Sequence, residues 1–200
     1  MSEERDDEIL TSAEPPEEPR ESNPPEEPPE ERKEPEAWER DPVPPAWRDA
    51  MDDPLVMALL EDFDDALESA RSFAGDLTVQ VRREAIAEVC ASLKEKHRFL
   101  LLVDLCGVDH SPREPRFDLL YVLHGFEANR RIRLLVRSGE EAPVPTVSTV
   151  WRGAGWLERE VWDLLGLRFA DHPDLTRIFL GEDFEGHPLR KDFPLEGTGA

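Results

Sequence analysis

The stretch Phe99-Leu-Leu-Leu-Val-Asp-Leu-Cys-Gly-Val108 decides the fold of this chain, because it forms a nearly continuous apolar run in the middle of the sequence. Periodicity alone leaves a buried helix possible, but the turn residues that flank the run favour a central β-strand. Residues 117–123 and 131–136 follow as two further strands, each preceded by a turn-forming segment. The sequence therefore predicts an antiparallel meander.

Upstream of this run, the hydrophobic spacing changes between helical and strand periods. Residues 54–73 place apolar side chains at helical spacing, and two aspartates precede them, as a helix N-terminus favours. Residues 76–81 alternate apolar with polar side chains, as a half-buried strand does, and residues 82–97 return to helical spacing. For residues 51–142 we predict an α+β fold, a two-layer domain with helices on a mostly antiparallel sheet of about four strands.

The first 50 residues differ in composition from the rest of the chain. They contain 18 acidic and 6 basic residues, a net charge of −12 out of −22 for the whole chain, and 11 of the 19 prolines. Such a segment buries too little apolar surface to offset the entropy lost on ordering. We predict that residues 1–50 form a disordered acidic tail.

Composition also excludes several functions. The acidic balance argues against a nucleic-acid partner, which requires a basic face. No apolar run approaches the roughly 20 residues of a membrane span, and the N-terminus lacks the features of a signal peptide, which favours the cytosol. Cys90 and Cys106 both lie in apolar stretches, which favours buried thiols, and two cysteines are too few for an ordinary iron–sulfur cluster.

The densest basic cluster of the predicted domain consists of Arg130, Arg131, Arg133 and Arg137. Because two of these arginines alternate with apolar residues, the first interpretation is the solvated face of an edge strand that charge protects from aggregation. The second is a docking patch for an acidic neighbour.

Residues 143–170 are predicted to form a linker and a short helix over 154–166, which ends at Gly166. On the polar side of this helix, Arg159 and Asp163 lie one turn apart and could pair. Three tryptophans lie within twelve positions, more than so short a helix needs for its own packing. We expect at least one of them to anchor an interface.

Residues 171–200 show no helical or strand period, although they contain three phenylalanines among glycine, proline and charged residues. Disordered tails are poor in aromatic residues. We therefore favour an ordered, extended arm that binds a partner over a disordered tail.

The motifs of this last third carry a family resemblance. They are Ala154-Gly-Trp-Leu-Glu-Arg-Glu-Val-Trp-Asp163, His172-Pro-Asp-Leu175, Arg177-Ile178 and Gly186-His-Pro-Leu-Arg-Lys-Asp-Phe-Pro194. Over about fifty residues these motifs resemble the C subunit of bacterial NADH-quinone oxidoreductase, respiratory complex I. The strands before them, including Val108-Asp109, also resemble the N-terminal domain of that family.

The resemblance implies a structural subunit of the peripheral arm of the complex, on the cytoplasmic face of the membrane. It implies a chain without its own cofactor, which clamps the hydrogenase-like quinone-site subunit near the terminal iron–sulfur subunit, while FMN and the iron–sulfur clusters belong to partner subunits. The residues expected at the partner interface are Trp156, Glu158, Arg159, Glu160, Asp163, His172, Arg177, His187, Arg190, Lys191, Asp192 and Phe193.

Two alternatives stay open at this point. The same motifs fit the corresponding subunit of a related membrane-bound hydrogenase, or of a dehydrogenase with another electron donor. A more distant alternative is a free-standing metal-dependent hydrolase, because carboxylates and imidazoles such as Asp171, His172 and His187 are common metal ligands. No HExxH or comparable ligand spacing supports the hydrolase.

Overall fold

The computed structural model describes residues 46–194 and 196. Most of the predicted acidic tail therefore lies outside the described residues. The exception is its last part, where the short strand β1 (Arg48–Asp49) pairs with β2 and Ala50 is buried. The folded domain thus begins a few residues before the boundary predicted at residue 51.

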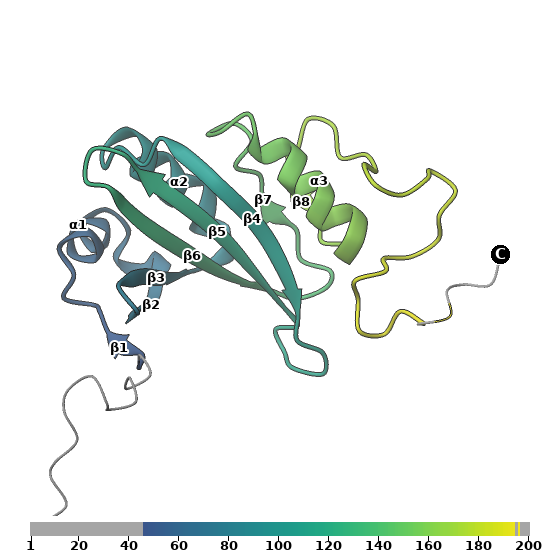
Figure 1. The fold of residues 1–200 in the computed structure, drawn as a ribbon, viewed down its shortest axis with the longest axis horizontal. Helices are drawn as coiled ribbons and strands as arrows, with labels where there is room; N and C mark the ends of the chain where they lie inside the picture. The colour runs from purple at the N-terminus through teal and green to yellow at the C-terminus, as the bar shows by residue number, and fades with distance from the viewer. Residues whose placement is uncertain (1–45, 195, 197–200) are drawn as a thin grey trace, which may run out of the picture. The chain divides into compact units, whose positions relative to one another are not determined.

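The main element of the domain is a six-stranded sheet with the order β1-β2-β3-β6-β5-β4 (Figure 1). Beyond β1, its strands are β2 (Leu67–Phe73), β3 (Asp76–Val81), β4 (Leu101–Asp109), β5 (Phe117–Gly125) and β6 (Arg130–Ser138). The predicted meander of β4, β5 and β6 is confirmed. The predicted number of about four strands is wrong, and β3 pairs with β6 in parallel, so the sheet is mixed.

The predicted helix over residues 54–73 is wrong in its second half. Helix α1 (Pro54–Phe63) begins where expected, with the Asp53 carboxylate accepting a hydrogen bond from the N–H of Leu55 at 2.9 Å. A short 3₁₀ turn, η1 (Asp64–Ala66), follows, and the chain then enters β2. Within β2, Leu67 and Ala70 are both buried at a spacing of three, as on a helix, because a bulge between Leu67 and Ser69 shifts the register of the strand.

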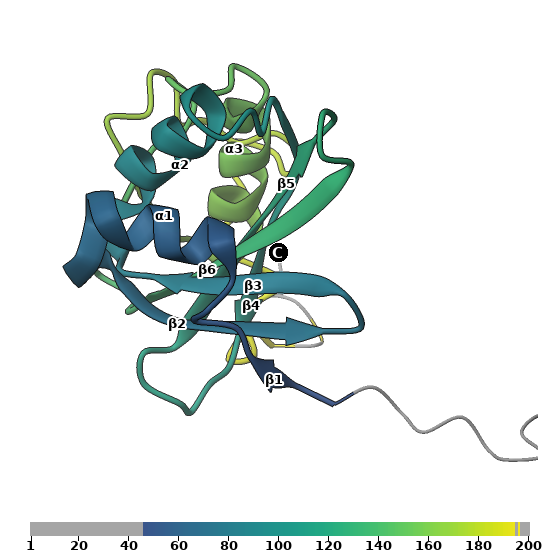
Figure 2. The same ribbon diagram turned by 90° about the vertical axis from the view of Figure 1, so that its left-hand side faces the viewer.

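The three helices lie on one side of the sheet (Figure 2). They are α1, α2 (Ile86–Glu95), which follows the 3₁₀ turn η2 (Arg83–Ala85), and α3 (Ala154–Leu165). The strands meet them with alternate residues, so that Leu119, Tyr121 and Leu123 of β5 are fully buried. This side of the sheet forms the hydrophobic core, and the predicted two-layer α+β architecture is confirmed.

The opposite face of the sheet carries the arginine cluster. Arg131 and Arg137 are exposed, and they alternate with the buried Ile132, Leu134 and Val136 of β6. However, β6 lies between β3 and β5, so the expectation of an edge strand is wrong. The arginines instead mark a sheet face that the described helices leave uncovered.

The last part of the domain leads into the arm. Strands β7 (Val144–Pro145) and β8 (Phe169–Ala170) pair in parallel on either side of α3 in the sequence. This pairing holds both ends of the segment that contains α3. From residue 171 to residue 194 the chain contains no helix or strand and runs past α3 as an extended arm, drawn in yellow in Figure 1.

Candidate functional site

Helix α3 connects the domain to the arm. It packs on β4 through Val161 and Leu165, and Gly107 of β4 makes this close approach possible. A Cβ atom at Gly107 would lie 2.5 Å from Leu165 Cδ1 and 3.3 Å from Val161 Cγ1. A glycine within a strand often marks such a contact. The helix therefore presents its remaining side chains to the arm from a fixed position.

Asp163 of α3 organises the first half of the arm. It is fully buried, and its Oδ2 accepts hydrogen bonds from the consecutive N–H groups of Ile178, Phe179 and Leu180 at 3.0, 2.9 and 3.1 Å. Its Oδ1 accepts from Nη1 of Arg177 at 2.6 Å. Burial by itself would raise the pKa of Asp163, but the backbone N–H groups and the guanidinium together hold this pKa below its usual range. Asp163 is thus an ionised carboxylate that fixes one turn of the arm.

Arg177 continues this arrangement toward the next turn. Its Nη2 donates to the carbonyl oxygens of Phe184 and Gly186 at 2.8 and 3.2 Å. Arg159 does not form the predicted pair with Asp163. It donates instead to the carbonyl oxygens of Thr176 and Arg177 at 2.9 and 2.8 Å. The two arginines therefore donate hydrogen bonds to carbonyl oxygens of the arm, which lies outside any helix or strand.

Glu158 and His172 fasten the beginning of the arm. Glu158 is fully buried and accepts hydrogen bonds from the Thr146 hydroxyl and from the N–H of Val147, the latter at 2.7 Å. Burial raises the pKa of Glu158, although the Thr146 hydroxyl acts in the opposite direction. The His172 ring lies against this carboxylate, with 3.6 Å between His172 Nε2 and Glu158 Oε2.

The hydrogen bonds of His172 indicate its tautomer. Its Nδ1 accepts from the N–H of Asp174 at 3.1 Å, so the proton lies on Nε2, which donates to the carbonyl oxygen of Gly155 at 3.1 Å. Both ring nitrogens are therefore used within the chain, in a structural role.

The C-terminus of α3 receives the second half of the arm. His187 Nδ1 donates to the carbonyl oxygen of Asp163 at 2.9 Å, and Arg190 Nε donates to that of Leu165 at 2.6 Å. These contacts satisfy helix carbonyls that lack partners within the helix. Gly166 adopts a positive φ of 78°, and a Cβ atom there would lie 2.6 Å from His187 Cδ2 and 2.7 Å from Arg190 Nη2. Only glycine fits both the backbone and the space.

The end of the arm is held by an ion-pair cluster on the sheet. The guanidinium of Arg116 donates to both carboxylate oxygens of Asp109, at 2.9 and 2.7 Å, and to both oxygens of Asp192, at 3.1 and 2.8 Å. The N–H of Lys191 donates to Asp109 at 2.8 Å. Hydrogen bonds from Arg116 lower the pKa of Asp109 and of Asp192. Arg190 also pairs with Glu140.

The sequence analysis missed Arg116 and Glu140 as site residues. It also assigned no contact to Asp109, which lies in the part that resembles the N-terminal domain of the family. These three residues lie 50 to 82 positions before their partners in the arm, so no local pattern links them. The only sequence signal for Arg116 was its position directly before Phe117, at the start of a predicted strand. This signal is weak.

The residues predicted at a partner interface divide into two groups. Glu158 and Asp163 are buried, and the side chains of Arg159, Arg177, His172, His187, Arg190 and Asp192 are engaged with groups of this chain. Trp156 is 60% exposed, beside the Arg159 guanidinium, whereas Phe193 is half-buried and stacks on Phe184. Glu160 and Lys191 have no side-chain hydrogen bond among the described residues.

Other large apolar side chains of the arm are also exposed. Phe179 is 64% exposed and Leu189 is 59% exposed, and none of residues 171–194 is buried. The arm therefore has a course that is fixed largely by polar contacts, while the side chains of Phe179 and Leu189 are left exposed.

Two further observations concern metal and membrane. Within residues 46–194 and 196, no three side chains among the histidines, cysteines and carboxylates gather closely enough to hold a metal ion. In the same part of the chain, every helix is too short or too polar to span a bilayer.

Comparison with known proteins now gives the family. Residues 79–199 match the family described as "Respiratory-chain NADH dehydrogenase, 30 Kd subunit". The C 2 subunit of the NADH-quinone oxidoreductase of Rhizobium meliloti (strain 1021) is 47% identical over 142 residues, which cover 70% of this chain and 78% of that protein. The C subunit of the enzyme of Geobacter sulfurreducens (strain ATCC 51573 / DSM 12127 / PCA) is 43% identical over 144 residues, or 71% and 89% of the two chains.

A solved structure is also similar. One chain in the structure of the membrane-bound sulfane sulfur reductase (MBS), an archaeal respiratory membrane complex, matches with a TM-score of 0.61 and 25% identity, over 70% of this chain and 84% of that chain. The predicted resemblance is confirmed: the chain belongs to the family of the 30 Kd subunit of respiratory-chain NADH dehydrogenase.

Proposed function

We propose that this chain is a structural, non-catalytic subunit of the peripheral arm of the proton-pumping NADH-quinone oxidoreductase. In this proposal its terminal arm clamps the hydrogenase-like quinone-site subunit, near the terminal iron–sulfur subunit, on the cytoplasmic face of the membrane. FMN and the iron–sulfur clusters are carried by partner subunits. The family membership supports the assignment of this chain to the complex. The geometry of the arm supports its structural role.

The observation that carries the proposal is the contrast between a fixed arm and its uncovered apolar side chains. The side chains of Phe179 and Leu189 gain little hydrophobic stabilisation within this chain, since both residues are more than half exposed. Burial against a partner would contribute about 1.5–3 kcal/mol for each such side chain. Because Asp163 and Arg177 already hold the backbone, the arm loses little conformational entropy on binding.

The internal use of the titratable groups supports a non-catalytic role. A general base or nucleophile needs a free lone pair within reach of a substrate. The Asp163 carboxylate is occupied by four donors, and the ring nitrogens of His172 are bonded to groups of this chain. These groups shape the arm.

A second candidate is the equivalent subunit of a related respiratory complex that uses another electron donor or acceptor. The likeness to a chain of the sulfane sulfur reductase complex favours it, because that likeness extends over most of both chains. Co-purification from native membranes separates the two candidates. A flavin- and NADH-binding chain among the partners supports NADH-quinone oxidoreductase. Its absence supports the related complex that uses another electron donor or acceptor.

The clamp can be tested with a double variant, Phe179→Ser and Leu189→Ser, in the full chain within its native complex. We expect the chain to fold but assembly to fail, as measured by native gel electrophoresis and by NADH:quinone activity of the membranes. Met57→Ser is the matched control, since Met57 of α1 is 53% exposed and remote in sequence from the arm. Normal assembly of the double variant contradicts the proposal. Stoichiometric, tightly bound zinc or iron in the isolated chain would favour the hydrolase instead.

A further inference from the structure

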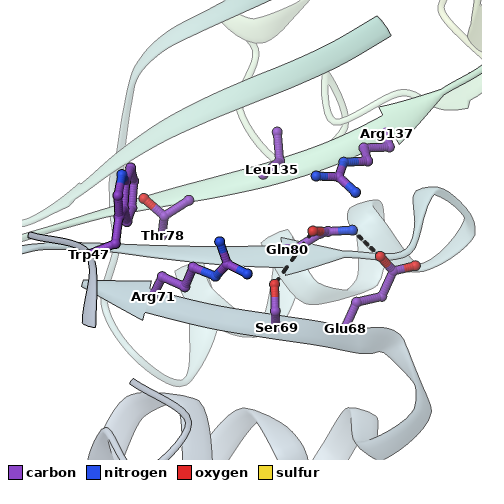
Figure 3. A pocket seen from close by; sticks show the side chains of 8 residues that line it. All are labelled: Trp47, Glu68, Ser69, Arg71, Thr78, Gln80, Leu135 and Arg137. Atoms are coloured by element: carbon purple, nitrogen blue, oxygen red, sulfur yellow. Dashed lines mark hydrogen bonds between the residues drawn. The ribbon is translucent and has the colours of Figure 1, made fainter. Parts of the chain in front are cut away.

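A pocket lies on the face of the sheet opposite the helices (Figure 3), and none of its lining residues takes part in the contacts that fix the arm. It has a volume of about 440 Å³ and is lined by side chains of β2, β3 and β6 together with Trp47, which precedes β1. This volume lies within the range of small-ligand sites. The clamp proposed above does not use the pocket.

The charge of the pocket comes from Arg71 and Arg137, whose guanidinium groups both extend into it in Figure 3. Arg71 has no carboxylate within 4.0 Å among the described residues. Arg137 forms a long ion pair with Asp118, at 3.7 Å between Nε and Oδ1, but no hydrogen bond to it. By contrast, Arg133 on the same strand is paired with Asp76 at 3.1 Å. Two guanidinium groups in one pocket therefore keep free donors.

The acidic group of the pocket, Glu68, forms no ion pair with Arg71 or Arg137 among the described residues. Glu68 accepts a hydrogen bond from the Gln80 amide, whose oxygen is 3.5 Å from the Ser69 hydroxyl. Figure 3 shows Glu68 beyond Gln80, at the opposite end of the pocket from Trp47. Side-chain hydrogen bonds thus hold Glu68 in place without neutralising Arg71.

Trp47 supplies a flat apolar wall. One part of its ring contacts Phe73, with 5.0 Å between ring centroids, and 54% of the residue is exposed. Next to it, the Thr78 hydroxyl has no hydrogen-bond partner, although it is buried. An unsatisfied polar atom of this kind calls for an explanation.

We propose that this pocket binds an organic oxyanion, with its carboxylate or phosphate between Arg71 and Arg137 and a flat apolar group against Trp47. Arginine binds such oxygens through paired N–H donors. The net charge of the chain does not prevent this, because charges farther away than a Debye length of about 8 Å are largely screened. Within the pocket, Glu68 is hydrogen-bonded to Gln80, so the donors of Arg71 and Arg137 are the groups that would contact the anion.

The test is NMR titration of the full-length chain, with ¹⁵N-labelled tryptophan and the Trp47 indole signal assigned through Trp47→Phe. The probes are phenyl phosphate, benzoate, inorganic phosphate and phenethylamine. We expect phenyl phosphate, benzoate or both to shift the Trp47 signal saturably, inorganic phosphate to bind more weakly, and phenethylamine not to bind. The tighter of the two aromatic anions identifies the natural ligand as a phosphate or a carboxylate.

Variants of Arg71 and Arg137 test how much each guanidinium contributes to binding of the anion. Arg71→Gln and Arg137→Gln should each weaken binding by about tenfold, as expected for the loss of a charge-assisted hydrogen bond. Arg131→Gln is the matched control, because Arg131 is an exposed arginine of the same strand outside the pocket. If a variant does not fold, added salt should weaken phenyl phosphate binding to the unaltered chain. No saturable shift, or equal loss in Arg131→Gln, would overturn the proposal.

Discussion

The sheet domain and the terminal arm are ordered by different forces. In the sheet, Phe117, Tyr121 and Leu134 are fully buried against the helices, and the hydrophobic effect dominates. In the arm, none of residues 171–194 is buried, yet Asp163, Arg177 and His187 fix successive turns. A segment without a core can thus hold one conformation when a preformed helix satisfies its backbone.

This difference has a consequence for stability. A hydrogen bond contributes about 0.5–1.5 kcal/mol net, and one to a charged group about 1.5–3 kcal/mol. The arm should therefore detach locally at a cost below that of global unfolding. The domain and the arm can be perturbed separately, which makes the comparison testable.

The largest effect is expected from a cavity in the core. Leu134→Ala should lower the free energy of unfolding by about 2–5 kcal/mol, because a fully buried leucine loses its packing. Urea unfolding followed by circular dichroism measures this change. Leu101→Ala is the control, since Leu101 is 42% exposed. A similar loss in both variants would contradict the assignment of the core to the helix side of the sheet.

A somewhat smaller and local effect is expected from Asp163→Ala. It removes the acceptor of three arm N–H groups and leaves Arg177 without its carboxylate, at a cost of about 3 kcal/mol. Hydrogen exchange should show loss of protection at Ile178, Phe179 and Leu180, while the sheet amides stay protected. Glu160→Ala on the same helix should leave the arm unchanged. If the sheet loses protection together with the arm, the two regions are not separable.

Gly166→Ala should weaken the second half of the arm by about 1–2 kcal/mol, from the left-handed backbone alone. The new Cβ atom would also collide with His187. NMR signals of residues 186–190 should report the displacement. Gly139→Ala is the control, because nothing lies within 4 Å of a Cβ atom there. Unchanged signals in Gly166→Ala would show that the contact of His187 and Arg190 with the C-terminus of α3 is not needed to hold the arm.

The smallest effect is expected from mild acid. The folded pKa values of Asp109, Asp163 and Asp192 are lowered, so the stability from these groups is present above about pH 3.9 and is lost as the pH falls through the folded pKa values. The pKa of Glu158 is raised, so its contribution has the opposite sign and is lost as the pH rises above about 4.3.

The measurement is the amide chemical shift of Phe179 and of Lys191 from neutral pH down to acid below the lowered pKa values of these carboxylates. We expect the shifts to stay constant near neutrality and to change below about pH 4, before the sheet signals do. If the sheet signals change first, the carboxylates are not what holds the arm.

The elements with a clear hydrophobic period could be predicted. Residues 76–81 alternate and form β3, and Phe117–Gly125 contains the predicted strand over 117–123. Strand β2 could not be predicted, because its bulge leaves Leu67 and Ala70 buried at a spacing of three, as on a helix. Its turn to β3 uses Ala74 and Gly75, both at positive φ, and alanine gives no turn signal there.

The sequence marked several residues of the candidate site but not their contacts. Asp163, Arg177, His187 and Arg190 stand in three separate motifs of the family resemblance, yet local spacing suggested that Arg159 would pair with Asp163. In the structure, Asp163 faces the arm and Arg177 takes that position, because a buried carboxylate needs several donors and the arm backbone supplies them.

The sequence by itself determined the family, the α+β class, the meander and the presence of an aperiodic, aromatic arm, since all of these follow from local period and from motif. Only the tertiary structure decided the parallel pairing of β3 with β6, the role of Arg116 as the anchor of Asp192, and the pairing of Asp163 with Arg177. The physical reason is that these contacts join residues far apart in the chain, and their partners are chosen by burial and by unsatisfied hydrogen-bonding groups.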